Sequence, residues 1–104
     1  MKTILFYDTE TTGLIEFRKP SEDPCQPRIT QIAAELCEEE TGAVISSINF
    51  IIKPNGWTIP EDLQKMTGIT MGKAEKFGEN MELVIPFFLT MWKAADLRVA
   101  HNES

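Results

Sequence analysis

The sequence is poor in cysteine and histidine. Its 104 residues contain one histidine and two cysteines, Cys25 and Cys37. The cysteines lack the C-x-x-C spacing and the further His and Cys ligands that a zinc site needs, so we expect two free, reduced thiols. Reduced thiols are typical of cytosolic proteins, and we therefore expect a cytoplasmic location.

Long apolar runs are also missing. No stretch approaches the roughly 20 apolar residues that a membrane-spanning helix needs. The first apolar run begins close to the N-terminus, with no signal peptide before it. We therefore expect no membrane partner. A length of 104 residues predicts one domain over residues 1–104 with a single modest core.

Positive charge is scarce as well. Ten Lys and Arg stand against 16 Asp and Glu, which gives a formal net charge of -6 at pH 7. This excess of acid argues against broad electrostatic attraction to nucleic acid or to anionic membranes. A phosphate-bearing ligand would have to be held locally, by a metal ion and by backbone donors.

The most informative stretch is an apolar run that ends in two alternating carboxylates. Residues 4–7 are rich in β-branched and aromatic side chains, and they predict a strand buried on both faces. Side chains at i and i+2 of a strand point to the same face, so Asp8 and Glu10 share one. Because the two carboxylates repel each other at the mouth of a buried strand, they need a proton or a cation.

A divalent metal ion would remove this repulsion. Oxygen-only ligands favour Mg²⁺ or Mn²⁺ over Zn²⁺, and these ions are usually bound together with substrate phosphate. Two such ions about 3.5–4 Å apart would suit phosphodiester hydrolysis. The alternative is that Asp8 and Glu10 lie on the solvated face of an edge strand and bind nothing. The Thr-Thr-Gly segment that follows favours the metal site, because its hydroxyls and amides can approach a ligand.

The rest of the chain predicts three further strands and two helices. We expect strands over 29–37, 43–53 and 97–100, and helices over 59–66 and 80–95. The first three strands would form a meander, and the last would run parallel to the first because a helix connects it across the sheet.

Single residues predict where the helices begin and end. Gly68 is expected to end the first helix, and Asn80 is a candidate N-cap for the second. Pro86 is expected to kink the second helix or to mark its true start. Residues 15–27 carry three prolines among charged residues, and we expect an exposed loop there.

The motif residues resemble a known family. The run Phe-Tyr-Asp-Thr-Glu-Thr-Thr-Gly-Leu at 6–14 is similar to the first motif of the DEDD-type, DnaQ-like 3'-5' exonucleases of the DEDDh subtype. The resemblance continues in 31–35, 66–70 and 95–102, so that it covers nearly the whole chain. It implies an α/β fold of ribonuclease-H type, a mixed sheet flanked by helices with the motif strand at its centre.

The same resemblance implies a function and a set of site residues. The family members are metal-dependent exonucleases that hydrolyse phosphodiester bonds at single-stranded 3' ends of DNA or RNA. Asp8 and Glu10 would be the catalytic residues and the metal ligands, in a complete site with two Mg²⁺ or Mn²⁺ ions. The residues that would contact the terminal nucleotide are Thr11, Thr12, Gly13, Leu14, Ile69, His101 and Asn102. For Ile69 an alternative is to anchor its helix to the core, and for His101 to close a strand end.

The family pattern is incomplete in this sequence. Ser104 comes just before the Phe-Asp that would complete the second motif, so we expect a C-terminally truncated exonuclease domain that is nearly inert alone. Two of the four acidic ligands and the general base are missing. The alternative is a non-catalytic interaction module that retains the sheet. Association with a polymerase, and self-association through a bare strand edge, stay open.

Overall fold

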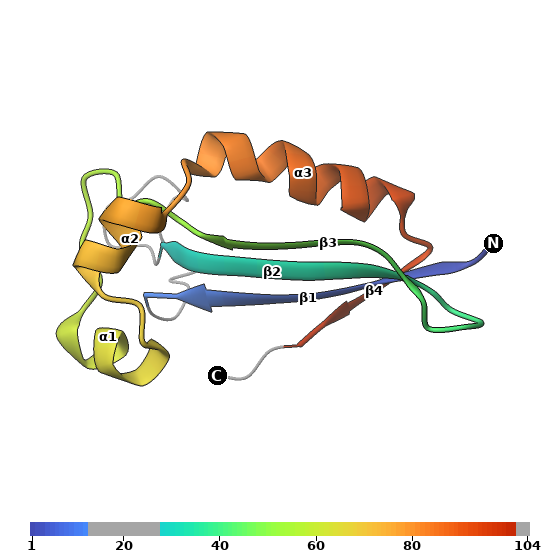
Figure 1. Cartoon of the computed structure of the whole chain (residues 1–104), viewed down its shortest axis with the longest axis horizontal. Helices are drawn as coiled ribbons and strands as arrows, with labels where there is room; N and C mark the ends of the chain where they lie inside the picture. Colours follow the sequence, from blue (N-terminus) through green and yellow to red (C-terminus); the bar gives the residue numbers. More distant parts are fainter. Residues whose placement is uncertain (13–27, 102–104) are drawn as a thin grey trace, which may run out of the picture.

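The computed structural model describes residues 1–12 and 28–101 (Figure 1). In this part of the chain, four strands and three helices follow one another in the order β1, β2, β3, α1, α2, α3, β4. Their bounds are Thr3–Thr11 for β1, Ile29–Glu38 for β2, Val44–Ile51 for β3, Glu61–Thr67 for α1, Met71–Phe77 for α2, Met81–Ala94 for α3 and Leu97–Ala100 for β4. None of these three helices is long and apolar enough to cross a membrane.

The strands form one mixed sheet in the order β3-β2-β1-β4. β1 pairs antiparallel with β2 and parallel with β4, and β2 pairs antiparallel with β3. The turn between β2 and β3 is closed by the Gly42 amide, which donates to the Glu38 carbonyl at 2.9 Å. The predicted meander and the parallel last strand are therefore confirmed, and the motif strand β1 lies inside the sheet.

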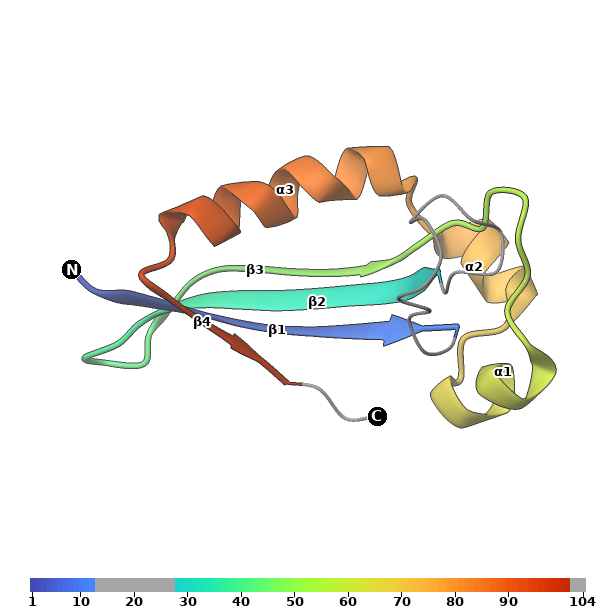
Figure 2. The ribbon, with the colours of Figure 1, turned by 180° about the vertical axis from the view of Figure 1, so that it is seen from behind.

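α3 covers one face of the sheet (Figures 1 and 2). Leu5 of β1 is fully buried there, in a cluster with Ala34 and Leu36 of β2 and Met91 and Ala95 at the C-terminal end of α3. The Tyr7 ring meets the rings of Phe88 and Trp92 edge-on, at centroid distances of 5.7 and 5.6 Å. Aromatic contacts of this geometry add to the burial of apolar area, so they fix α3 against β1.

The opposite face of the sheet is open to solvent in the described structure. Phe6 of β1 is 44% exposed, and its neighbours on β4, Leu97 and Val99, are 44% and 45% exposed. The prediction that residues 4–7 are buried on both faces is therefore wrong. The reason is architectural: α3 covers only one face, while α1 and α2 lie beyond one end of the sheet (Figures 1 and 2).

The helix boundaries confirm part of the predictions. Gly68 ends α1 in the left-handed conformation with φ 78°, as expected. Asn80 stands at the N-cap position of α3, but its side chain makes no capping hydrogen bond. α3 runs from Met81 through Pro86 without interruption, so Pro86 does not mark its start. α2 was not predicted, although Thr70 caps it by accepting a hydrogen bond from the Lys73 amide at 3.1 Å.

Cys37 is a buried, free thiol. This confirms the prediction for one of the two cysteines, and Cys25 lies outside the described residues. The Cys37 side chain sits on β2 close to the β2–β3 turn, where it fills space as a small apolar group.

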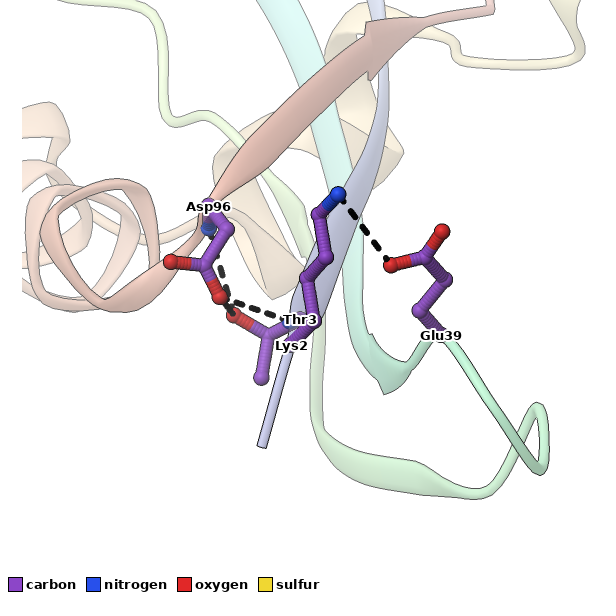
Figure 3. A network of polar contacts seen from close by, with 4 residues as sticks. All are labelled: Lys2, Thr3, Glu39 and Asp96. Atoms are coloured by element: carbon purple, nitrogen blue, oxygen red, sulfur yellow. Dashed lines mark hydrogen bonds and ion pairs between the residues drawn. The ribbon is translucent and has the colours of Figure 1, made fainter.

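A polar network joins the start of β4 to the start of β1 (Figure 3). The Thr3 amide donates to the Asp96 carboxylate at 2.8 Å, and the Asp96 amide donates to the Thr3 carbonyl at 3.1 Å. The Thr3 hydroxyl donates to the Ala94 carbonyl at 2.9 Å. Beside this network, Lys2 and Glu39 form an ion pair at 3.7 Å. The network sets the register of β4 against β1, and with it the position of every residue that follows on β4.

Because of this network, we expect the stability of the fold to depend on pH. The hydrogen bond from the Thr3 amide holds the pKa of Asp96 below its ordinary value of 3.8. Because the folded state lowers this pKa, the ionised carboxylate stabilises the fold above pH 3.8, and this stabilisation is lost as the pH falls through the lowered pKa. We expect Asp96→Asn to be less stable than the wild type at pH 6, with the difference shrinking towards pH 2.5.

Urea unfolding of both proteins at several pH values measures that difference. Other carboxylates titrate in the same range, but they are common to both proteins and cancel in the comparison. A stability difference that stays constant from pH 6 to pH 2.5 would show that the Asp96 charge does not act in this way.

Candidate metal and nucleotide site

Asp8 and Glu10 lie on the open face of the sheet. In the antiparallel register Asp8 is opposite Ala33 and Glu10 is opposite Gln31. Leu5 packs under α3, and side chains alternate along a strand, so even-numbered β1 residues point to the other face. Both carboxylates are half-buried. β1 itself extends to Thr11, so the pair is held by strand backbone that pairs with β2, while β4 pairs only with residues 4–7 of β1.

The end of β1 is tied to the start of β2 by three hydrogen bonds. The buried Thr30 hydroxyl donates to the Glu10 carbonyl at 3.0 Å. The Thr12 amide donates to the Arg28 carbonyl at 2.9 Å, and the Arg28 amide donates to the Thr12 hydroxyl at 2.8 Å. A bulge between Glu10 and Thr11 lies between these bonds. The three bonds therefore fix the backbone around Glu10 against the start of β2.

These bonds bear on the predicted nucleotide contacts. Thr12 uses its amide and one hydroxyl lone pair on Arg28, so its hydroxyl proton remains as the donor for a ligand. Thr11 is half-buried at the strand end, beside the bulge. Gly13, Leu14 and Asn102 lie outside the described residues. Nothing in the sequence alone signalled that Thr12 and Arg28 would meet, because the contact spans 16 positions.

The structure places Ile69 in the core. Its side chain is 4% exposed and packs with Ile59 and Ala74 at the junction of α1 and α2. This is the anchoring role, one of the two that the sequence left open. A base could not reach Ile69 in this structure, so we do not assign it a nucleotide contact.

His101 directly follows the end of β4. The parallel register pairs Tyr7 with Ala100, and the His101 amide donates to the Tyr7 carbonyl at 2.7 Å. The sequence predicted a nucleotide contact or a strand end for His101, and the structure places its backbone at the strand end.

The donor set fits a hard divalent cation with few protein ligands. Among residues 1–12 and 28–101, no group of three or more His, Cys, Asp and Glu is arranged to hold a metal ion. Asp8 and Glu10 are therefore two oxygen ligands on one face, without a closed cage. Mg²⁺ and Mn²⁺ are commonly bound in this way, through one or two carboxylates completed by water and phosphate.

The sequence profile of the RNase_T family, described as exonuclease, matches residues 5–104. No curated protein matches the chain by sequence.

Solved structures of exonuclease I share the fold. The structure of E. coli exonuclease I in complex with a dT13 oligonucleotide matches with a TM-score of 0.75 and 26% identity, over 98% of this chain and 21% of that one. A complex of exonuclease I with the C-terminal segment of SSB matches with a TM-score of 0.74 and 26% identity, over 97% and 21%. The chain thus spans about a fifth of the length of these structures.

The four-stranded mixed sheet with its three helices, in the part of the chain that is described, is the ribonuclease-H-like fold of these exonucleases. The family profile covers nearly all of the sequence and includes both carboxylates of the motif strand. The chain belongs to the RNase_T family of exonucleases.

Proposed function

We propose that the chain supplies two of the metal ligands of a metal-dependent 3'-5' exonuclease that acts on single-stranded DNA ends. The observation that carries the proposal is the pair Asp8 and Glu10, on one open face at the end of an interior strand of an exonuclease fold. The matching structures of exonuclease I include complexes with dT13 and with dA16 oligonucleotides. These complexes support DNA as the substrate class.

Each residue has a defined part in this proposal. Asp8 and Glu10 hold the divalent ion, and the Thr30 hydroxyl keeps the Glu10 backbone in place. The ion, when bound, supplies Lewis-acid activation of a phosphodiester and of the attacking water. The Thr12 hydroxyl donates towards the terminal nucleotide. His101, which directly follows β4, contacts the same nucleotide.

The carboxylates have a small and a polar neighbour on β2. Ala33 lies opposite Asp8, and Gln31 lies opposite Glu10. The exposed Glu35 lies opposite Phe6 on the same face, and it adds negative charge at one side of the site. An acidic surface of this kind repels a phosphodiester unless a cation is bound, so we expect capture of the 3' end beside the carboxylates to depend on the metal.

Binding of labelled strands tests the proposal without relying on fast turnover. A 5'-fluorescein dT8 strand is titrated with the protein in Mn²⁺, and separately in EDTA, and its anisotropy is followed. We expect metal-dependent binding of the strand with a free 3'-hydroxyl, with weaker binding of a 3'-phosphorylated strand. On long incubation in Mn²⁺, the 5'-labelled strand should shorten slowly from its 3' end.

The controls separate polarity from simple affinity. A 3'-labelled strand should release labelled mononucleotide first, whereas a 5'-3' nuclease would release long labelled fragments. Equal anisotropy in Mn²⁺ and EDTA, together with no preference for the 3'-hydroxyl, would contradict the proposal.

A second candidate is a non-catalytic interaction module. One observation favours it: Phe6, Leu97 and Val99 expose apolar surface side by side on the open face, and such patches commonly mark contact sites. The same titration separates the candidates, because an interaction module has no reason to capture a 3' end in a metal-dependent way.

A further inference from the structure

A hollow lies at the same end of the sheet as the carboxylates, but under α3. Its volume is about 580 Å³, and it is bounded by the start of β2, the end of β3 and the start of α3. This volume is within the range of about 300–1,000 Å³ that is usual for small-molecule sites. The side chains that matter for its chemistry are Arg28, Lys53, Asn55, Trp57, Asn80 and Glu82.

Arg28, which lines this hollow, carries an unsatisfied donor. Its Nε atom is buried and has no hydrogen-bond partner. Buried polar groups in folded proteins are nearly always paired, so an orphaned guanidinium nitrogen calls for an acceptor. Among the described residues, the structure has one ion pair, between Lys2 and Glu39. No carboxylate of these residues therefore pairs with Arg28 or Lys53.

The charge of the lining is opposite to that of the whole chain. Arg28 and Lys53 are basic, and Glu82 is acidic and exposed, which leaves the lining with one net positive charge. The sequence as a whole carries a formal net charge of -6. A basic hollow on an acidic protein concentrates its attraction for an anion at one place.

The start of α3 adds backbone donors to the two basic side chains. α3 is 14 residues long, and the Asn80 side chain makes no capping hydrogen bond. The first amides of a helix have no partner within the helix, and the helix dipole favours an anion at this end. Asn80 and Met81 line the hollow, so these donors lie at its wall.

Trp57 supplies a flat apolar surface in the same hollow. It is half-buried, and it packs against both of the core clusters that meet at this end of the sheet. An aromatic side chain held in this way can stack on a nucleic-acid base whatever the sequence, and the exposed Asn55 nearby offers an amide to a base edge.

Hydrogen bonds connect the wall of the hollow to the strand that carries the carboxylates. Arg28, in its wall, exchanges two hydrogen bonds with Thr12, two residues after Glu10. The carboxylates face away from α3 and the hollow lies beneath α3, so the two sites are on opposite faces at one end of the sheet. A strand that occupies both would pass around that end.

We infer that this hollow binds a nucleoside monophosphate unit, with the phosphate held by Arg28, Lys53 and the start of α3 and the base stacked on Trp57. The unit is either a nucleotide of the single strand on the 5' side of its 3' terminus or a released mononucleotide. The inference deepens the proposed function and rests on it for the identity of the ligand.

Tryptophan fluorescence tests this assignment directly, because the chain has two tryptophans, Trp57 and Trp92. In a Trp92→Phe protein the signal comes from Trp57. We titrate this protein in EDTA with dT8 and, in a second arm, with dTMP. Stacking of a base on Trp57 should quench its fluorescence in a saturable way in at least one arm.

Charge variants show whether the phosphate is held where we place it. In the Trp92→Phe background, Arg28→Gln and Lys53→Gln should each weaken the quenching titration about tenfold and reduce the salt dependence of dT8 binding by about one unit of slope. Lys93→Gln, at the far end of α3, is the matched control and should leave both unchanged. Because Arg28 contacts Thr12 through its backbone, Arg28→Gln keeps that link, and far-ultraviolet circular dichroism verifies the fold.

The outcomes separate this inference from the proposed function. Quenching by dT8 in EDTA that persists in Asp8→Asn supports a strand site independent of the metal, and quenching by dTMP alone supports a site for the released nucleotide. Absence of quenching in both arms, or quenching that is insensitive to Arg28→Gln and Lys53→Gln, overturns the inference. That result would leave metal-dependent capture of 3' ends untouched.

Discussion

Gly78→Ala is expected to lower the free energy of unfolding by about 1–3 kcal/mol, a typical cost of overpacking. A Cβ atom at position 78 would lie 2.7 Å from the Lys53 backbone nitrogen and would also collide with the Ala74 carbonyl oxygen. Both obstacles are backbone atoms, which cannot rotate away as a side chain does. Gly78 has an ordinary backbone conformation with φ -73°, so the cost comes from contact and not from a strained dihedral angle.

The backbone around Gly78 has no room to relax. Glu79, the next residue, accepts from the Lys53 amide at 2.9 Å and donates to the Ile51 carbonyl at 2.8 Å. This short parallel bridge fastens the connection between α2 and α3 to the end of β3. Moving the chain away from Lys53 would stretch these bonds, and moving it towards α2 would close on Ala74. Lys53 also lines the hollow beneath α3.

Urea unfolding of Gly78→Ala measures the loss, and Gly72→Ala is its matched control. Gly72 lies in α2, and a Cβ atom there would meet nothing within 4 Å. Replacing a helical glycine by alanine stabilises by roughly 0.5–1 kcal/mol, so Gly72→Ala should be neutral or stabilising. Similar effects of the two substitutions would mean that the close approach of Gly78 to Lys53 does not govern stability.

Local patterns in the sequence predicted most of the sheet. The short acidic turn with Gly42 joins two β-branched runs, and it produced the expected hairpin of β2 and β3. The apolar period over 80–95 predicted α3, and a helical crossover forced β4 to run parallel to β1. These features are encoded over a few neighbouring residues, so a single sequence is enough to find them.

Other features depend on contacts that the sequence does not display. The continuous apolar run 4–7 is equally compatible with a strand covered on one face, and only the placement of α3 shows that Phe6 is exposed. α2 is seven residues long and lacks a clear apolar period, although Thr70 offered a capping signal. The core position of Ile69 follows from the packing of α1 and α2 together.

The candidate site divides in the same way. The alternation of Asp8 and Glu10 placed both carboxylates on one face from sequence alone, as the register of β1 with β2 confirms. Only the structure shows the other features of the site. These are the hydrogen bond from Thr30 to Glu10, the hydrogen bonds between Thr12 and Arg28, and the hollow with Trp57. These groups come from separate strands and loops, and no spacing in the sequence brings them together.

Loss of a carboxylate should have the largest effect on metal binding. We expect the chain to bind Mn²⁺ weakly through Asp8 and Glu10, because the cation relieves the repulsion between them. Two unit charges 4 Å apart near a protein surface attract by about 4 kcal/mol. This exceeds the about 1.4 kcal/mol that corresponds to a tenfold change in affinity. Asp8→Asn should therefore weaken Mn²⁺ binding by well over about tenfold, and Glu10→Gln should do the same, with little effect on the fold.

Glu40→Gln is the matched control for Glu10→Gln. Glu40 lies in the turn between β2 and β3, at the end of the sheet opposite the carboxylates (Figure 1). The substitution Glu40→Gln removes the same charge from the protein as Glu10→Gln does, without changing the proposed site. Any loss of Mn²⁺ affinity in this variant reports the change in net charge alone, and it is subtracted from the effect of Glu10→Gln.

The decisive measurement is a titration of Mn²⁺ into the wild type, Asp8→Asn, Glu10→Gln and Glu40→Gln, with free Mn²⁺ counted by electron paramagnetic resonance. The account predicts one weak site in the wild type and in Glu40→Gln, and no measurable site in Asp8→Asn or Glu10→Gln. Mn²⁺ binding of equal strength in all four proteins would contradict the assignment of Asp8 and Glu10 as the metal ligands.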